Sequence, residues 1–159
     1  MFACVGLGGN LDAPIPRLAA ALHRLSNWPG VSGLRASRLY RSAPWGRADQ
    51  PPFVNAVAAF EYDGDARSLL RGLLAIEREA GRVRGDARWG PRRLDLDLLV
   101  FGDSEMAEPD LQLPHPHLHE RAFVLVPLAE VASSLDIPGR GAVQALLARV
   151  DASVVTAIN

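Results

Sequence analysis

Hydrophobic residues recur along the chain with two periods: every second position, as in strands, and every third or fourth position, as in helices. Strands are predicted at 2–7, 34–40, 53–62 and 94–101. Helices are predicted where apolar residues share one face, at Leu18, Leu22 and Leu25, at Leu69, Leu73, Ile76 and Ala80, and over 121–132 and 143–149. The order is therefore strand, helix, strand, strand, helix, strand, followed by a mainly helical tail.

Turn-forming residues separate these elements. The segment Gly8 to Asn10 is predicted to be a turn after the first strand, and Asp63 to Asp65 turns the chain and can cap the second helix. Gly81 fits the C-terminal end of that helix. The proline-rich segment 42–52 and the charged segment 82–93 are predicted to be loops.

The order of elements is the βαββαβ pattern of a ferredoxin-like α+β sandwich, here with a mainly helical C-terminal extension. A length of 159 residues predicts a single domain that covers 1–159. Hydrophobic residues make up 48% and charged residues 22% of the chain, which fits a folded protein rather than a disordered one.

Charge and composition exclude several classes of protein. A net charge of −1 provides no field that attracts nucleic acid or an anionic membrane. The longest apolar runs, such as 123–129, are far shorter than the roughly 20 residues of a membrane helix, and no secretory signal is recognisable. The one cysteine, Cys4, excludes an intramolecular disulfide. We therefore expect a cytoplasmic monomer without nucleic-acid or membrane partners.

Asp95 and Asp97 are the sharpest chemical signal. In the fourth strand, alternation predicts one face with Leu94, Leu96, Leu98 and Val100 and the other with Asp95, Asp97, Leu99 and Phe101. Two carboxylates on one face repel each other unless a cation lies between them, and Mg²⁺ commonly takes one or two carboxylates plus water and phosphate oxygens. An isolated pair of this kind is more often a solvated strand face.

Arginines directly before this pair change that balance. All 17 basic residues of the chain are arginine, and five of them fall within twelve positions: Arg82, Arg84, Arg88, Arg92 and Arg93. Arginine binds phosphate in bidentate fashion, so cations on one side and carboxylates on the other can hold a metal–polyphosphate complex. Trp89 inside this cluster argues against a purely solvated surface.

Three alternating histidines suggest a second possibility, a zinc site formed by His115, His117 and His119. Pro114 and Pro116 interrupt the strand that such a site would need. A histidine beside phosphate, or a surface histidine, is therefore favoured over zinc.

Asn55 is a weaker signal on the third strand, where it shares a face with Phe53 and Val57. It is either a polar edge residue or an amide that binds a flat heterocycle beside an aromatic ring. The segment Gly8 to Asn10 lacks the Gly-Lys-Ser/Thr ending of a P-loop, so it carries little functional signal.

Taken together, these segments resemble the 6-hydroxymethyl-7,8-dihydropterin pyrophosphokinases of folate biosynthesis. The resemblance runs from Val5 to about Leu135, and its most specific string is Arg88-Trp89-Gly90-Pro91-Arg92-Arg93-Leu94-Asp95-Leu96-Asp97. Supporting segments are Gly6–Leu11, Ser37–Ser42, Pro44–Gly46, Gln50–Asn55, Ile76–Glu77, Gly81–Arg84, Leu113–His115 and Glu120–Phe123.

The resemblance implies transfer of pyrophosphate from ATP to the hydroxymethyl group of the pterin, with release of AMP. It implies two Mg²⁺ ions on Asp95 and Asp97, and assistance to the transfer by Arg82 and Arg92. The implied pterin-binding residues are Ser42, Ala43, Trp45, Phe53, Asn55 and Phe123. The implied ATP-binding residues are Glu77, Arg84, Arg88, Trp89, Arg92, His115 and Arg121. The loops Ala43–Phe53 and Arg82–Arg92 are expected to close over both substrates.

Two positions depart from the family pattern. Asp110 stands where a basic residue can help to hold phosphate, and Pro116 stands where an aromatic residue is often found near the nucleotide. Both departures concern nucleotide affinity more than activity. No Ser or Cys nucleophile with an adjacent base is evident, and positioning with charge stabilisation is sufficient for attack of the pterin hydroxyl on the β-phosphorus.

Two other functions remain open from the residues alone. Another metal-dependent phosphoryl or nucleotidyl transferase would use the same Asp95 and Asp97 pair. Release of AMP, rather than of ADP or free pyrophosphate, distinguishes a pyrophosphokinase from such an enzyme. A ferredoxin-like RNA-binding module would need surface aromatics in basic surroundings. The aspartate pair and the slightly negative net charge argue against RNA.

Overall fold

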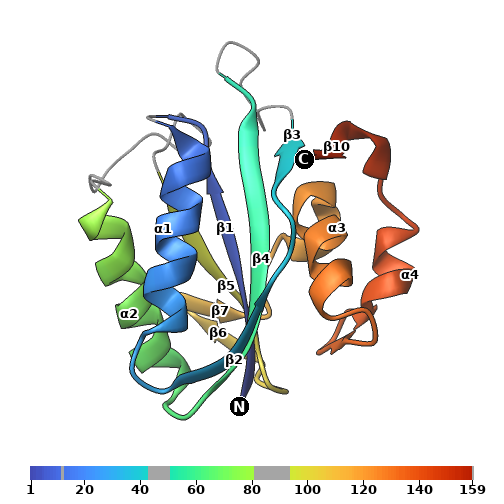
Figure 1. The fold of residues 1–159 in the computed structure, drawn as a ribbon. Helices are drawn as coiled ribbons and strands as arrows, with labels where there is room; N and C mark the ends of the chain where they lie inside the picture. Colours follow the sequence, from blue (N-terminus) through green and yellow to red (C-terminus); the bar gives the residue numbers. More distant parts are fainter. Residues whose placement is uncertain (12, 43–50, 81–93, 159) are drawn as a thin grey trace.

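The computed structural model describes residues 1–11, 13–42, 51–80 and 94–158, and a six-stranded antiparallel sheet forms its centre (Figure 1). The sheet contains β1 (Phe2–Gly9), β2 (Val31–Ala36), β3 (Tyr40–Ser42), β4 (Phe53–Tyr62), β5 (Asp95–Phe101) and β10 (Val155–Ala157). Its strand order is β10-β3-β4-β1-β5, and β2 also pairs with β4. β5 therefore lies at one edge.

Helices cover both faces of this sheet. Figure 1 shows α1 (Pro14–Ser26) and α2 (Ala66–Glu79) on one side, and α3 (Ala122–Val131) and α4 (Val143–Leu147) on the other. Each side encloses its own apolar cluster, because alternate strand residues point to opposite faces. The α1/α2 cluster contains Leu7, Phe60 and Leu73, and the α3 cluster contains Val57 and Leu125.

The predicted cap of the second helix is confirmed. The side chain of Asp65 accepts a hydrogen bond from the backbone N–H of Ser68 at 2.8 Å, which satisfies one of the free donors in the first turn of α2. Gly81, the predicted end of this helix, lies outside the described residues.

The predicted strand 34–40 is wrong in its extent, because the chain forms two shorter strands there. β2 ends at Ala36, and β3 begins at Tyr40. Between them, Ser37 exchanges hydrogen bonds with Val57: its N–H donates to the Val57 carbonyl at 2.9 Å, and its hydroxyl accepts from the Val57 N–H at 3.0 Å. A side-chain hydroxyl thus takes the place of a backbone acceptor and interrupts the regular ladder.

The predicted alternation of the fourth strand is also wrong beyond Leu99. The register between β1 and β5 shifts, so that Cys4 pairs with Val100 and Val5 pairs with Leu98. This bulge reverses the faces that follow it. Val100 packs in the α3 cluster, and Phe101 packs in the α1/α2 cluster.

The C-terminal part contains more than the predicted helices. α3 and α4 lie within the predicted ranges, and β10 returns to the main sheet, where it pairs with β3. Two small hairpins and two short 3₁₀ turns complete the elements of the described ranges. They are β6 (Met106–Glu108) with β7 (Leu111–Leu113), β8 (Asp136–Ile137) with β9 (Gly141–Ala142), η1 (Leu118–Glu120) and η2 (Ala152–Val154). In the described part of the chain, no helix has the length and apolar character to cross a membrane.

Candidate active site

A row of paired residues crosses the sheet at Gly8. Asn55 of β4 pairs with Gly8 on one side, and Asp95 of β5 pairs with it on the other. All three positions lie on the face of the sheet that α3 covers further along, because Val57 and Leu99 on the same face belong to the α3 cluster. The row therefore joins a neutral amide and a carboxylate across a strand position that has no side chain.

Gly8 makes room for the Asn55 side chain. A Cβ atom placed on Gly8 would lie 2.9 Å from the Oδ1 atom of Asn55, which is closer than real Cβ contacts allow. Glycine is thus the residue that permits the observed position of the amide. The prediction of a turn from Gly8 to Asn10 is wrong for its first two residues, because Gly8 and Gly9 are the last residues of β1.

Asn55 is held in place by the neighbouring strand. Its Nδ2 atom donates to the hydroxyl of Ser42 at 2.8 Å, and both residues are buried. Phe53 is the register partner of Ser42 and stands two positions before Asn55, on the same face of β4. Ser42, Phe53 and Asn55 therefore form one surface, as expected for residues that share a site.

Asp95 and Asp97 lie on one face of β5, opposite Gly8 and Gly6 of β1. Both aspartates are half-buried, while Leu96 between them faces the α1/α2 cluster. Within the described ranges, no group of three or more histidine, cysteine or acidic residues could hold a metal ion. A pair of carboxylates suits Mg²⁺, which completes its shell with water and phosphate oxygens.

Glu77 approaches this strand from α2. Its side chain is buried, and one carboxylate oxygen accepts the backbone N–H of Leu96 at 2.6 Å. In the described part of the chain, β5 has no strand neighbour on the side away from β1, so Glu77 supplies this N–H with an acceptor. Glu77 thus contacts the backbone between the two aspartates, and its expected contact with ATP stays a prediction.

His115 lies next to the aspartate pair. Its backbone N–H donates to the carbonyl of Leu99 at 2.9 Å, which ties the segment to β5. Burial lowers the pKa of its imidazole to about 4, the charges of Arg121 and His117 act in the same direction, and Asp95 opposes them. The ring is therefore neutral at pH 7, and its Nδ1 atom accepts the N–H of His117 at 3.2 Å.

The three alternating histidines do not converge on one point. The rings of His115 and His117 are tilted, with centroids 6.1 Å apart, while His117 and His119 each approach Glu120, at 3.5 and 3.4 Å. The preference against zinc stays a prediction.

Arg121 and Phe123 stand at the start of α3. The Arg121 guanidinium lies over the Phe123 ring, 5.6 Å from its centroid, and Phe123 is half-buried at the border of the α3 cluster. Asp110 is exposed and pairs with Arg67 of α2 at 2.7 Å, so its charge is compensated locally. Pro116 is half-buried between His115 and His117.

Seven of the residues expected at the site lie outside the described residues: Ala43, Trp45, Arg82, Arg84, Arg88, Trp89 and Arg92. The same holds for most of the two loops that were expected to close.

Gly8 is the site residue whose importance the sequence analysis underestimated. The sequence feature that could have identified Gly8 is the spacing of Gly6 and Gly8, which leaves two successive positions on one face of a strand without side chains.

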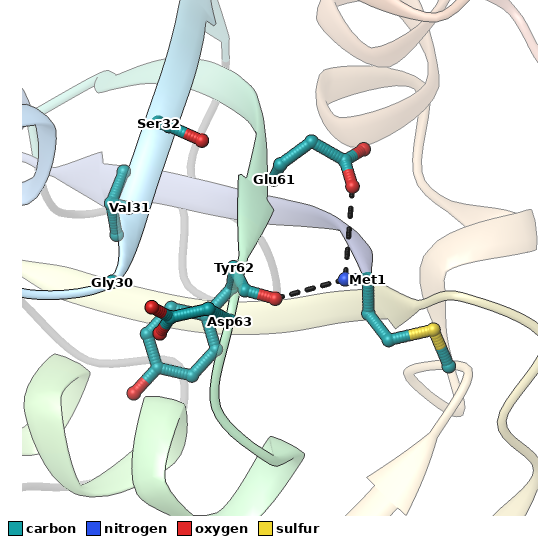
Figure 2. A pocket seen from close by; sticks show the side chains of 7 residues that line it. All are labelled: Met1, Gly30, Val31, Ser32, Glu61, Tyr62 and Asp63. Carbon is teal, nitrogen blue, oxygen red and sulfur yellow. Dashed lines mark hydrogen bonds and ion pairs between the residues drawn. The ribbon is translucent and has the colours of Figure 1, made fainter.

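A pocket of about 390 Å³ lies elsewhere, around the N-terminus (Figure 2). It is lined by Met1, Gly30, Val31, Ser32, Glu61, Tyr62 and Asp63. The terminal amine donates to the Tyr62 carbonyl at 2.9 Å and lies 3.7 Å from the Glu61 carboxylate. Phe2 pairs with Glu61 while Gly8 pairs with Asn55, so this pocket is at the other end of β1 and contains none of the predicted site residues.

Residues 4–133 match the family described as 7,8-dihydro-6-hydroxymethylpterin-pyrophosphokinase. A relative from Pseudomonas aeruginosa, named 2-amino-4-hydroxy-6-hydroxymethyldihydropteridine pyrophosphokinase, is 49% identical over 134 residues, 84% of this chain and 82% of the relative. One of the same name from Methylorubrum extorquens is 42% identical over 151 residues, 95% and 94% of the two chains.

A solved structure of wild-type Plasmodium falciparum HPPK-DHPS is similar in fold, with a TM-score of 0.69 at 13% identity. The similarity covers 93% of this chain but only 43% of that one, so this chain spans less than half of the longer protein. The family match covers most of this chain, and the two relatives exceed 40% identity over most of its length. The chain belongs to the 7,8-dihydro-6-hydroxymethylpterin-pyrophosphokinase family.

Proposed function

We propose that the row around Gly8 is where this chain transfers pyrophosphate from ATP to 6-hydroxymethyl-7,8-dihydropterin. The products are AMP and the pterin diphosphate, and the step belongs to folate biosynthesis. The observation that carries this assignment is the register Asn55–Gly8–Asp95. It places an amide suited to the pterin and a carboxylate suited to metal-bound phosphate on the two strands that flank one glycine.

Asp95 and Asp97 hold the divalent metal that ATP chemistry requires, and we assign two Mg²⁺ ions to them. When bound, these ions neutralise the triphosphate and polarise its β-phosphorus. The two carboxylates fit this role because they share a face of β5 and are only half-buried. Arg82 and Arg92 are assigned to the stabilisation of charge on the transferring group.

Asn55 recognises the edge of the pterin through its amide, which can both donate and accept hydrogen bonds. Ser42 fixes the orientation of that amide. The aromatic rings of Phe53 and Phe123 supply flat surfaces for the heterocycle. Ala43 and Trp45 complete the assigned pterin site.

His115 is assigned to ATP binding. In the ligand-free chain, burial lowers the pKa of its imidazole, so the ring is uncharged at pH 7 and its Nδ1 atom accepts the N–H of His117. Arg121 provides a fixed positive charge beside His115. Further ATP-binding residues are assigned from the resemblance: Glu77, Arg84, Arg88, Trp89 and Arg92.

The fold that supports this site is assigned as a ferredoxin-like sandwich in a single domain, 1–159. Its βαββαβ core is β1, α1, β2 with β3, β4, α2 and β5, and the sheet order places β1 between β4 and β5. The C-terminal extension carries α3 and α4. We assign the protein as a cytoplasmic monomer.

A product assay tests the proposed reaction. The purified protein is incubated with ATP, Mg²⁺ and the reduced pterin, and adenine nucleotides are separated over time. One AMP for each pterin consumed, and none in a chelator, is the expected result. Formation of ADP or of free pyrophosphate would instead indicate a different transferase, and RNA binding that persists in the chelator would indicate a binding module.

A further inference from the structure

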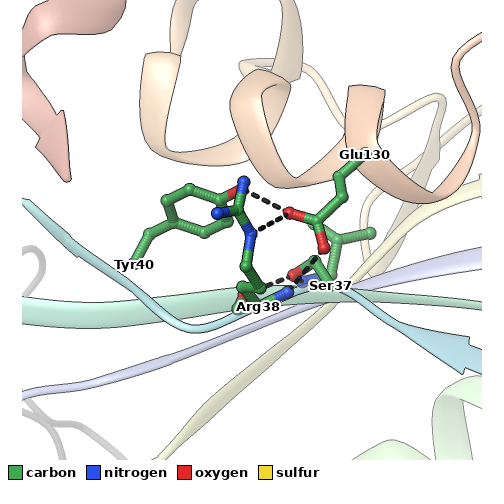
Figure 3. A network of polar contacts seen from close by, with 5 residues as sticks. Ser37, Arg38, Tyr40 and Glu130 are labelled. Carbon is green, nitrogen blue, oxygen red and sulfur yellow. Dashed lines mark hydrogen bonds and ion pairs between the residues drawn. The ribbon is translucent and has the colours of Figure 1, made fainter. Parts of the chain in front are cut away.

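A polar network joins α3 to the sheet close to the candidate site (Figure 3). The Tyr40 hydroxyl donates a short hydrogen bond to the Oε1 atom of Glu130 on α3. Arg38 donates to the same carboxylate twice, from its backbone N–H to Oε2 at 2.8 Å and from its Nε to Oε1 at 3.2 Å. We call Arg38, Tyr40 and Glu130 the α3 latch.

The latch is firmly connected on the sheet side. Tyr40 is 4% exposed and is the register partner of Asn55. Ser37, also drawn in Figure 3, bonds Val57 of β4 through both its N–H and its hydroxyl, and its hydroxyl donates to the Arg38 carbonyl at 2.7 Å. The segment from Ser37 to Tyr40 is thus attached to β4 and to α3 at the same time.

On the helix side, the latch is connected to the proposed pterin wall. Glu130 lies seven residues after Phe123, which is about two turns and about 10 Å along the same face of α3. Two turns of α3 therefore separate the Glu130 carboxylate from the Phe123 ring. Ser42, which orients Asn55, lies two residues after Tyr40 on β3.

The electrostatics of the latch agree with a strong contact. Hydrogen bonds from Tyr40 and Arg38 lower the pKa of Glu130 against the opposing effect of its burial. Burial first, and then the Glu130 carboxylate, raise the pKa of Tyr40. At neutral pH the pair is therefore a neutral hydroxyl that donates to a carboxylate, and such charge-assisted bonds are among the stronger hydrogen bonds in proteins.

We propose that the α3 latch sets the spacing between Phe123 and the Ser42–Asn55 surface, and thereby the affinity for the pterin. Its three members are positioning residues that act through others. This inference rests on the proposed function, which makes those two surfaces the walls of the pterin site. Apolar packing through Leu125 and Leu128 keeps α3 folded against the sheet without the latch. Loss of the latch is therefore expected to shift the Phe123 side of the site rather than to unfold the protein.

Two conservative variants test the latch. Tyr40→Phe removes only the hydroxyl, and Glu130→Gln removes the charge while it keeps the shape. With a non-hydrolysable ATP analogue and Mg²⁺ present, each is expected to bind the reduced pterin about tenfold more weakly, while ATP affinity and melting temperature change little. Because both variants weaken the same contact, the hydrogen bond from the Tyr40 hydroxyl to Glu130, the double variant is expected to lose less affinity than the sum of the two single losses.

The matched control is Glu79→Gln. It weakens another carboxylate–arginine pair between two elements, Arg24 with Glu79 at 2.5 and 2.8 Å, which joins α1 to α2. It is expected to leave both affinities unchanged. Equal pterin affinity in wild type and Tyr40→Phe, or an equal loss for ATP and pterin, would overturn the latch.

Hydrogen exchange in the free protein separates this inference from the proposed reaction. The Arg38 amide donates to Glu130, so Tyr40→Phe is expected to speed its exchange, whether or not the pterin binds. Unchanged exchange of that amide would overturn the latch by itself. Failure of the wild type to bind the pterin would contradict the proposed function. In that case the exchange rate of the Arg38 amide still shows whether Tyr40 and Glu130 stabilise the contact between α3 and the sheet.

Discussion

Glu77 accepts a hydrogen bond from the backbone N–H of Leu96, the residue between Asp95 and Asp97, at 2.6 Å. The two residues come from different elements, α2 and the edge strand β5. Among the residues that the structure describes, no strand pairs with β5 on that side, and the carboxylate takes the place of such a partner. The strand that carries both proposed metal ligands is therefore held by β1 on one side and by a helix side chain on the other.

Replacement of Glu77 is expected to reveal this support. Glu77→Leu leaves the buried Leu96 N–H without its acceptor and is expected to lower the free energy of unfolding by about 1–3 kcal/mol and to slow the transfer. Glu77→Gln keeps an acceptor oxygen and is expected to recover most of both. Urea unfolding and steady-state kinetics measure the two effects. Wild-type stability of Glu77→Leu would contradict the claim that Glu77 stabilises β5 through the Leu96 N–H.

Gly8 is expected to be sensitive to a single methyl group. Gly8→Ala places a Cβ atom 2.9 Å from Asn55 Oδ1, so the amide must move and its bond to Ser42 is strained. We expect a selective loss of pterin affinity, measured by titration beside ATP. Gly6→Ala is the matched control, because its nearest contact is the end of the Leu99 side chain at 3.5 Å. Equal effects of the two variants would contradict the assignment of Gly8.

Asn55→Ala is expected to weaken pterin binding by roughly 1–3 kcal/mol, because the polar edge of the bound ring loses its hydrogen-bond partner. The effect on ATP binding is expected to be much smaller. Calorimetric titration with each ligand measures this difference. Equal losses for both ligands would indicate that Asn55 has a structural role only.

The thiol of Cys4 is expected to be inert in the folded protein. Cys4 is fully buried, and burial raises the pKa of its thiol to about 12, with Arg35 opposing the shift. Only the thiolate reacts with disulfide reagents, so labelling at pH 8 is expected to require unfolding. Rapid labelling of the native protein would show that this part of the sheet opens readily.

The sequence predicted the elements whose periodicity is local. The strand at 53–62, the cap at Asp65 and the shared face of Asp95 and Asp97 all follow from spacing within one element. It could not predict the bulge opposite Cys4, because a register shift depends on the partner strand. β10 was missed because three residues carry too short a pattern.

The supporting contacts of the site were also beyond sequence reasoning. Tyr40 and Glu130 are 90 positions apart, and Glu77 is 19 positions from Leu96. Neither spacing follows from a helical or strand period, so only the packing of α2 and α3 on the sheet brings these residues together. Residue types alone pointed to metal and phosphate chemistry. The role of Gly8 became clear only from its register partners on the two neighbouring strands, Asn55 and Asp95.

The most direct test of the central claim compares AMP formation by the wild type, Asp97→Asn and Asp103→Asn under saturating ATP, Mg²⁺ and reduced pterin. Asp97 shares a face of β5 with Asp95 of the proposed row, while Asp103 is exposed just beyond the other end of β5 and serves as the matched control. Loss of a metal ligand is expected to cost several kcal/mol of transition-state stabilisation and nearly to abolish AMP formation in Asp97→Asn, with an unchanged melting temperature. Asp103→Asn is expected to keep the wild-type rate. Near-normal AMP formation by Asp97→Asn would contradict the assignment of the reaction to this site.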